Sequence, residues 1–168
     1  MSEAEITNWG YIAYKKIWDS FSLNKILAGM ASSTKISFDL SKTSFLMAVS
    51  HLLNPSSKLS VYNNQDKYTN ISPVGLNDIY RSLDILADSK EKIEKEIFET
   101  NRNLFNMSAD VVFYDVTTFS FSSVRPDSLK YFGYSKKGKP NKVQVVTGLL
   151  IDYYGRPIGY EISPGNTF

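Results

Sequence analysis

One carboxylate in an apolar strand pattern is the residue of this sequence best placed to do chemistry. Asp115 lies in residues 109–121, where side chains alternate between two faces that are both largely apolar. The pattern predicts that both faces are covered, so we expect Asp115 to be half buried or more. A buried carboxylate is costly unless it accepts hydrogen bonds, pairs with a base or binds a cation. Asp115 is therefore a candidate catalytic residue and metal ligand; the alternative is a structural acid that caps a turn or pairs with a lysine.

A basic segment follows this strand and is the second group of candidates. Between Arg125 and Lys142, six basic residues face one acid, Asp127, which gives a local net charge of +5 in a chain whose net charge is +2. Such a concentration of positive charge attracts phosphate. The alternative is a charged, solvated loop. The candidate phosphate-binding residues are Lys136, Lys137, Lys139 and Lys142.

Composition excludes several other kinds of site. The chain has no cysteine, which excludes disulfides, thiolate metal sites and cysteine nucleophiles and fits a reducing compartment. The only histidine, His51, lies in an apolar run, and no partner is spaced for it, so we expect a packed core or interface histidine. No apolar run reaches the length of a membrane span, and the N-terminus does not resemble a signal peptide. These features predict a cytoplasmic protein with no membrane partner.

Two kinds of periodicity divide the chain at Ala109. Before it, apolar residues recur at helical spacing, with Gly29 as a predicted helix stop; after it, the period becomes two. We therefore predict an α+β protein with an all-helical domain over residues 1–108 and a three-stranded antiparallel meander over residues 109–168. The expected helices are 11–27, 40–53, 76–86 and 89–105, with a short helix or connector at 58–68. The expected strands are 109–121, 143–152 and 158–162, with a tight hairpin after Asp152 and a long loop over 122–141.

The second half of the chain resembles a known family. The motifs Y-D-V-T-T, F-G-Y-S-K-K-G-K-P, V-Q-V-V-T-G-L-L-I-D and G-Y-E-I-S-P-G-N-T resemble insertion-sequence transposases of the DDE class. The resemblance implies that residues 109–168 open an RNase H-like catalytic domain and that Asp115 is its first catalytic acid and metal ligand, with Mg²⁺ or Mn²⁺ as the cofactor. It implies double-stranded DNA at transposon ends as a partner, contacted by the four lysines, and the chain itself or a full-length transposase as a further partner.

The same resemblance covers only the first acid of the catalytic triad. The second Asp and the Glu of the family lie beyond the matched segment, and the chain ends at Phe168. We therefore expect a transposase fragment that does not cleave or join DNA alone. Among the acids present, Asp110 is expected on the opposite strand face and Asp152 in the hairpin turn, which leaves Glu161 as the least unsuitable second acid.

Other interpretations remain open beside this one. One is a non-catalytic module that binds DNA or a transposase and regulates transposition. Another is a helical regulator unrelated to transposition, in which Asp115 and the basic loop have no common function. In a fragment of the family's domain, the first strand is expected to form an exposed apolar edge that pairs with another chain.

Overall fold

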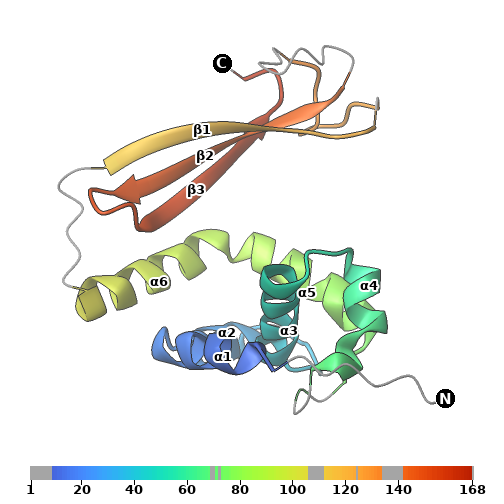
Figure 1. The fold of residues 1–168 in the computed structure, drawn as a ribbon, viewed down its shortest axis with the longest axis vertical. Coiled ribbons are helices and arrows are strands. Elements are labelled where there is room, and N and C mark those ends of the chain that lie inside the picture. The colour runs from blue at the N-terminus through green and yellow to red at the C-terminus, as the bar shows by residue number, and fades with distance from the viewer. Residues whose placement is uncertain are drawn as a thin grey trace. The chain divides into compact units, whose positions relative to one another are not determined.

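The computed structural model describes residues 9–68, 71, 73–105, 112–123, 125–133 and 142–167. The chain divides into two compact units, Met1–Leu104 and Phe105–Phe168. Helices make up the first unit and a three-stranded antiparallel sheet the second (Figure 1), so the predicted α+β class is confirmed. The domain boundary predicted between residues 108 and 109 lies outside the described residues.

The helical unit begins with two helices where the sequence predicts one. Helix α1 spans Tyr11–Ser20 and helix α2 spans Leu23–Ser32. Between them Ser22 has a φ of 55°, in the left-handed region that interrupts a right-handed helix. The single helix predicted over residues 11–27 is therefore wrong. Gly29, the predicted stop, lies inside α2.

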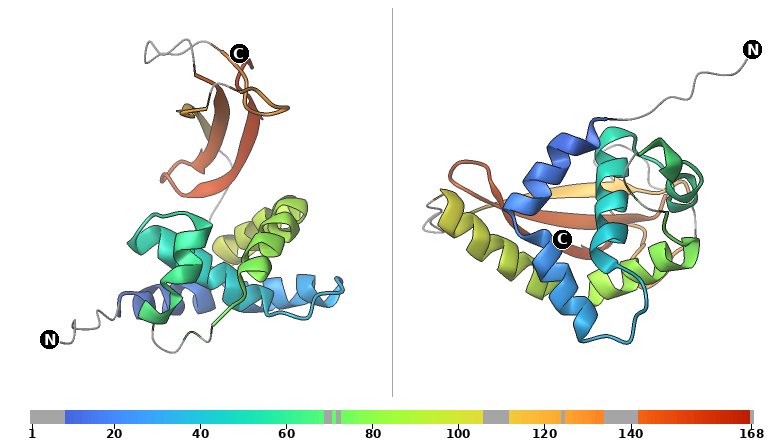
Figure 2. Two further views of the ribbon diagram at one scale, coloured as in Figure 1. Left: turned by 90° about the vertical axis from the view of Figure 1, so that its right-hand side faces the viewer. Right: turned by 90° about the horizontal axis from the view of Figure 1, so that it is seen from below.

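Helix α3 is the packing centre of this unit. It spans Leu40–Leu53, and the Asp39 side chain caps it by accepting the backbone N–H of Lys42 at 2.9 Å. It ends at Asn54, directly before a proline, as predicted. Its long apolar sequence packs against α1, α2 and two later helices, α4 (Lys58–Asn63) and α5 (Leu76–Asp88) (Figure 2). Helix α3 lies at the centre of a buried cluster. The cluster consists of Tyr11, Phe45, Leu46, Met47, Val49, Val61, Tyr68, Val74 and Ile79.

The remaining helices match their predicted positions. Helix α4 spans Lys58–Asn63, the short helix η1 spans Gln65–Lys67, α5 spans Leu76–Asp88 and α6 spans Lys90–Phe105. Helix α6 carries interleaved acids and bases, including the pair between Lys90 and Glu94 at 3.1 Å, which suits a solvated face. Across the ranges that the structure describes, none of the helices combines the length and the apolar character that a membrane crossing requires.

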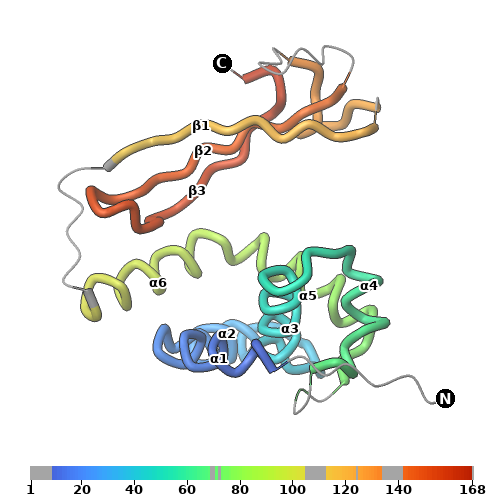
Figure 3. The backbone as a smooth tube through the Cα atoms, in the orientation of Figure 1, coloured from blue at the N-terminus to red at the C-terminus, as the bar shows by residue number. Residues whose placement is uncertain are grey.

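The sheet is the predicted meander. Strand β1 spans Val112–Ser120, β2 spans Gln144–Asp152 and β3 spans Pro157–Pro164, in the spatial order β1-β2-β3 (Figure 3). The pairing of β1 with β2 runs without interruption, whereas the pairing of β2 with β3 shifts by one residue between Leu150 and Ile151. This shift is a β-bulge. It decides which residues of β3 lie on the same face of the sheet as a given residue of β1, such as Asp115.

Candidate functional site

Asp115 lies near the middle of β1 on an open face of the sheet. Its cross-strand neighbours on that face are Leu149 of β2 and, one strand further, Tyr160 of β3. The Asp115 side chain is exposed, and the neighbours are 40% and 41% exposed. The prediction that Asp115 is at least half buried is therefore wrong, because apolar alternation does not show what covers a face. Within the described residues, no base or hydrogen-bond donor contacts its carboxylate.

The sheet does not bring another acid to Asp115. Glu161 pairs with Gly148, which pairs with Val116, so Glu161 lies on the opposite face. Glu161, the least unsuitable second acid in the sequence, therefore does not share the face of Asp115. The bulge causes this, because an unshifted register would place Glu161 opposite Thr147, on the face of Asp115. Asp110, expected on the opposite face, lies outside the described residues.

The ion that the family resemblance implies does not fit the residues present. Mg²⁺ and Mn²⁺ take about six oxygen ligands, and a two-cation centre needs several carboxylates converging on one point. In the described part of the chain, no three His, Cys, Asp or Glu side chains gather in a way that could hold a metal. Asp115 contributes one carboxylate. Within the described residues, Asp115 therefore has no neighbouring acids that would complete a two-cation centre.

Asp152 is a buried carboxylate, and it organises the predicted hairpin. It is 1% exposed, and its Oδ1 accepts the backbone N–H groups of Tyr154 at 3.0 Å and Arg156 at 2.8 Å. Its Oδ2 accepts Nε of Arg156 at 2.7 Å and lies 2.6 Å from Nη2. Burial alone would raise the pKa of Asp152, but the side-chain and backbone hydrogen bonds from Arg156 hold the pKa below its usual range. Asp152 serves the turn, as its position predicts.

Asp127 folds the first half of the loop that follows β1. Its Oδ1 accepts the backbone N–H groups of Leu129 at 2.9 Å and Lys130 at 2.6 Å, and Oδ2 lies 3.0 Å from the Lys130 ammonium. The backbone N–H of Lys130, followed by its ammonium and by the N–H of Leu129, lowers the pKa of Asp127 to about 2. The Lys130 ammonium also lies 5.8 Å from the ring centre of Phe121. This part of the loop is a folded turn.

A set of backbone contacts joins this turn to the end of the sheet; we call it the loop clasp. Tyr131 and Gln144 exchange backbone hydrogen bonds of 3.0 and 2.9 Å, and Gly165 donates to the carbonyl of Leu129 at 3.1 Å. The buried Gln144 side chain donates to the carbonyl of Gly165 at 2.8 Å. A Cβ atom at Gly133 or Gly165 would overlap backbone atoms of the clasp. The clasp ties the loop to the start of β2 and the end of β3.

The clasp lies within the basic segment at Tyr131 and directly after it at Gln144. Lys142 is half buried and precedes Val143, which is fully buried. The three other candidate lysines, Lys136, Lys137 and Lys139, lie outside the described residues. The sequence pattern identified the lysines but did not predict the clasp. The signal for the clasp in the sequence is the position of the glycines in F-G-Y and S-P-G, because glycine permits close approach of two backbones.

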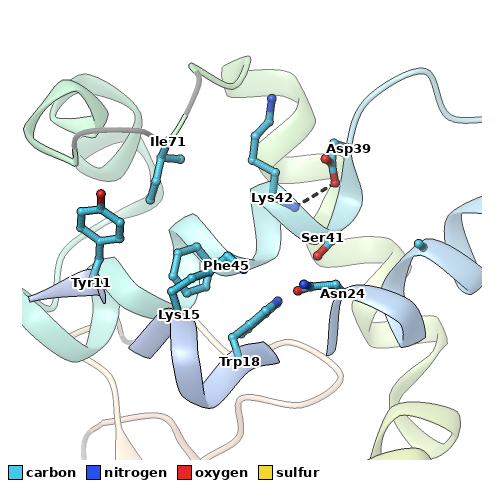
Figure 4. Close-up of a pocket in the computed structure, with 10 residues that line it drawn as sticks. Tyr11, Lys15, Trp18, Asn24, Asp39, Ser41, Lys42, Phe45 and Ile71 are labelled. Carbon is cyan, nitrogen blue, oxygen red and sulfur yellow. Dashed lines mark hydrogen bonds between the residues drawn. The ribbon is translucent and has the colours of Figure 1, made fainter. Parts of the chain in front are cut away.

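A cavity of about 540 Å³ opens in the helical unit and was not predicted (Figure 4). Its apolar wall includes Trp18 and Phe45, whose ring centres lie 5.3 Å apart edge to face. Two of its three charged residues are engaged in the fold: Asp39 caps α3, and Lys15 pairs with Asp19. The lining residues are Tyr11, Lys15, Trp18, Asn24, Ala28, Asp39, Ser41, Lys42, Phe45 and Ile71. The aromatic residues of its wall occur at helical spacing in the sequence. Such spacing predicts buried core residues and gives no sign of a cavity.

The structure contradicts one of the two alternatives predicted for His51, the packed core histidine; the interface histidine stays a prediction. His51 lies in the last turn of α3 with its side chain exposed, so it is not a packed core histidine. The apolar run around His51 predicted burial on all sides, but near its end α3 buries one side more fully than the other. Leu52, the next residue, is 60% exposed.

Comparison of the chain with known protein families, with curated proteins and with solved structures finds no match in any of the three.

Proposed function

We propose that this chain is part of a DDE-class transposase, that residues 109–168 open its RNase H-like domain, and that the chain alone binds the phosphate backbone of double-stranded DNA without cleaving it. The observation that supports binding is the way the sheet holds the basic segment. The loop clasp lies on both sides of residues 134–141, with Tyr131 before them and Gln144 after them. A segment held at both ends loses less conformational freedom on binding than a loose one.

The distribution of charge supports the same assignment. Residues 1–109 carry twelve acids and twelve bases, whereas the basic segment has a net charge of +5. Asp127 pairs with Lys130 at 3.0 Å, so we assign phosphate binding to the four other lysines of the segment, Lys136, Lys137, Lys139 and Lys142. Lysine contacts phosphate as a point charge and carries no base information, so the binding is sequence-independent.

The position of Asp115 supports binding without cleavage. Asp115 is exposed on one face, Glu161 lies on the other, and Asp152 is committed to the hairpin. A chain that offers one carboxylate to the reaction centre needs further acids from outside the region described. This favours the role of a DNA- or transposase-binding module for the chain in isolation, within the same transposase ancestry.

The binding is tested by the salt dependence of affinity. Three to five phosphate contacts give a slope of log affinity against log salt of roughly −3 to −4.5 on duplex DNA, at about 0.9 per contact. Replacing Lys136, Lys137 and Lys139 together with alanine is expected to flatten the slope by about two to three units. Fluorescence anisotropy across a salt series measures both values.

The matched control is a triple alanine variant of Lys90, Lys92 and Lys95 on α6. Acids interleave these lysines, and Lys90 pairs with Glu94 at 3.1 Å, so the slope is expected to change by less than one unit, on the order of one contact or fewer. If the α6 variant loses the salt dependence and the loop variant keeps it, DNA binding lies in the helical unit and the proposal fails.

The lack of cleavage is tested separately. Incubated with DNA and Mn²⁺, the chain is expected to leave every phosphodiester intact, because one carboxylate does not hold two bridging cations. Gel analysis of end-labelled duplexes is the assay, and Asp115→Asn is the paired variant. Metal-dependent cleavage that disappears in Asp115→Asn would show that this chain completes a site by itself, and would overturn this part of the proposal.

A further inference from the structure

Another cavity of the helical unit lies at the end of α3. It has a volume of about 220 Å³ and is lined by residues of α3, α4 and η1 and of the segments that flank them. Of its eight lining residues, seven carry a hydroxyl, an amide or an ammonium group, and the eighth is Val61. None of these eight is acidic. This lining suits a polar ligand, in contrast to the aromatic wall of the larger cavity in the same unit.

Ser50 of α3 contributes a buried hydroxyl to this lining. The residue is 3% exposed, and its Oγ has no hydrogen-bond partner in the part of the chain that the structure describes. Elsewhere in the helical unit, the buried hydroxyls of Thr43 and Ser82 donate to the carbonyl four residues earlier, at 2.8 and 2.7 Å. A buried hydroxyl that makes no such bond normally bonds to water or to a ligand. Ser50 therefore offers a hydrogen-bond donor to the cavity.

Two backbone carbonyl groups of the lining residues already accept hydrogen bonds. The carbonyl of Ser50 accepts the N–H of Asn54 at 2.8 Å. The carbonyl of Ser60 accepts both the N–H of Asn64 at 3.1 Å and its side-chain Nδ2 at 2.8 Å. These acceptors are thus paired within the protein, whereas the Ser50 hydroxyl is not. A ligand that accepts hydrogen bonds complements such a lining better than one that donates them.

The charge of the lining is positive. Lys67 is the one charged residue among the eight, and across the described ranges its ammonium contacts no acid. Asp66, its neighbour in η1, does not line the cavity. Tyr68 is 7% exposed and adds a hydroxyl that has no partner among the described residues. One ammonium and several hydroxyl donors, with no acid, favour an anion whose oxygens accept hydrogen bonds.

We propose that this cavity binds a phosphate group, either free phosphate or the end of a phosphate monoester. Its volume equals that of about seven water molecules at about 30 Å³ each, which is enough for a tetrahedral oxyanion. It is smaller than the roughly 300–1,000 Å³ of sites that enclose a whole drug-sized ligand, so the rest of a monoester lies outside. The site is separate from the basic segment and independent of the proposed DNA binding.

The ligand is tested by isothermal titration calorimetry of the full chain in chloride buffer at constant ionic strength. The probes are inorganic phosphate, phenyl phosphate and dimethyl phosphate. Inorganic phosphate is expected to bind at one saturable site, and binding of phenyl phosphate as well would identify a monoester end as the ligand. Dimethyl phosphate is expected not to bind, because its methyl groups cover two of the oxygens. If inorganic phosphate shows no saturable binding, or if dimethyl phosphate binds equally well, the proposal is overturned.

Two substitutions place the binding in this cavity. Ser50→Ala is expected to weaken the affinity for inorganic phosphate about five- to tenfold, because it removes one donor to an anion. The variant should fold, since the hydroxyl has no protein partner and alanine is a better helix former than serine. Lys67→Met keeps the length of the side chain and removes its charge, and is expected to weaken binding about tenfold or more.

Each substitution has a matched control. Ser44 lies on the same helix, is 5% exposed and also has a hydroxyl without a partner in the described region, but it does not line the cavity. Lys58 begins α4 and does not line the cavity either. Ser44→Ala and Lys58→Met are expected to change the affinity by less than about twofold, since screening weakens the effect of a distant charge. If Ser44→Ala weakens binding as much as Ser50→Ala, or Lys58→Met as much as Lys67→Met, the anion binds elsewhere and the proposal fails.

Discussion

Alanine in place of Gly165 is expected to destabilise the sheet strongly. A Cβ atom there would overlap the carbonyl oxygens of Gln144 and Tyr131, which are backbone atoms fixed by the loop clasp. Overpacking against atoms that cannot rotate away costs about 3 kcal/mol or more. For a unit of this size, that lowers the melting temperature by roughly 12 °C or more. Thermal unfolding followed by circular dichroism at strand-sensitive wavelengths measures the effect.

Gly29→Ala is the matched control. A Cβ atom at Gly29 meets nothing within 4 Å, and the residue lies in the interior of α2. Alanine there is expected to stabilise the helical unit by about 0.5–1 kcal/mol, because glycine is a poor helix former. If Gly165→Ala melts at the native temperature, the backbone of the clasp yields at little cost. The basic segment would then lack the rigid base on which the proposed DNA binding depends.

The sequence predicted the helices and strands well where the spacing of apolar residues repeated over many residues. Helix α3 was placed with both ends because Asp39 and the Asn54-Pro55 pair mark them chemically. The break between α1 and α2 was missed because Ser22 adopts a left-handed conformation that its residue type does not require. Both helices contribute to one core cluster, so the apolar spacing continues across the break.

The candidate site was harder to predict because it depends on register. Alternation within β1 correctly placed Asp115 on one face of a strand, but its exposure depends on what lies against that face. Whether Glu161 lies on the same face as Asp115 depends on two registers, that of β1 with β2 and that of β2 with β3. A shift of one residue in either register moves Glu161 to the other face. The bulge between Leu150 and Ile151 is such a shift; its signal in the sequence is Gly159, which pairs with Leu150, but a glycine inside a strand does not by itself define the register.

Removing the Asp152 side chain is expected to destabilise the hairpin between β2 and β3. In Asp152→Ala, two backbone N–H groups and the Arg156 guanidinium lose their acceptor. We expect the melting temperature of the sheet to fall by at least roughly 4–8 °C, the shift that a loss of about 1 kcal/mol produces in a unit of this size. Asp152→Asn keeps an oxygen acceptor and loses the charge, so a smaller decrease is expected. Asp115→Asn on the exposed face is the matched control, with little change in monomer stability.

The same carboxylate makes the stability of the sheet dependent on pH. The hydrogen bonds from Arg156 hold the pKa of Asp152 below its unfolded value, so folding favours the charged form. This contribution is fully present above the ordinary aspartate pKa of about 3.9 and is lost as the pH falls through the lowered, folded-state pKa. The melting temperature of the native chain should therefore fall more steeply below about pH 4 than that of Asp152→Asn, which has no proton to bind there.

Asp127, with its pKa of about 2, contributes in the same direction, so both proteins should retain a residual slope. If the two melting curves shift in parallel with pH, the charge of Asp152 does not stabilise the hairpin, and its backbone hydrogen bonds alone hold the turn.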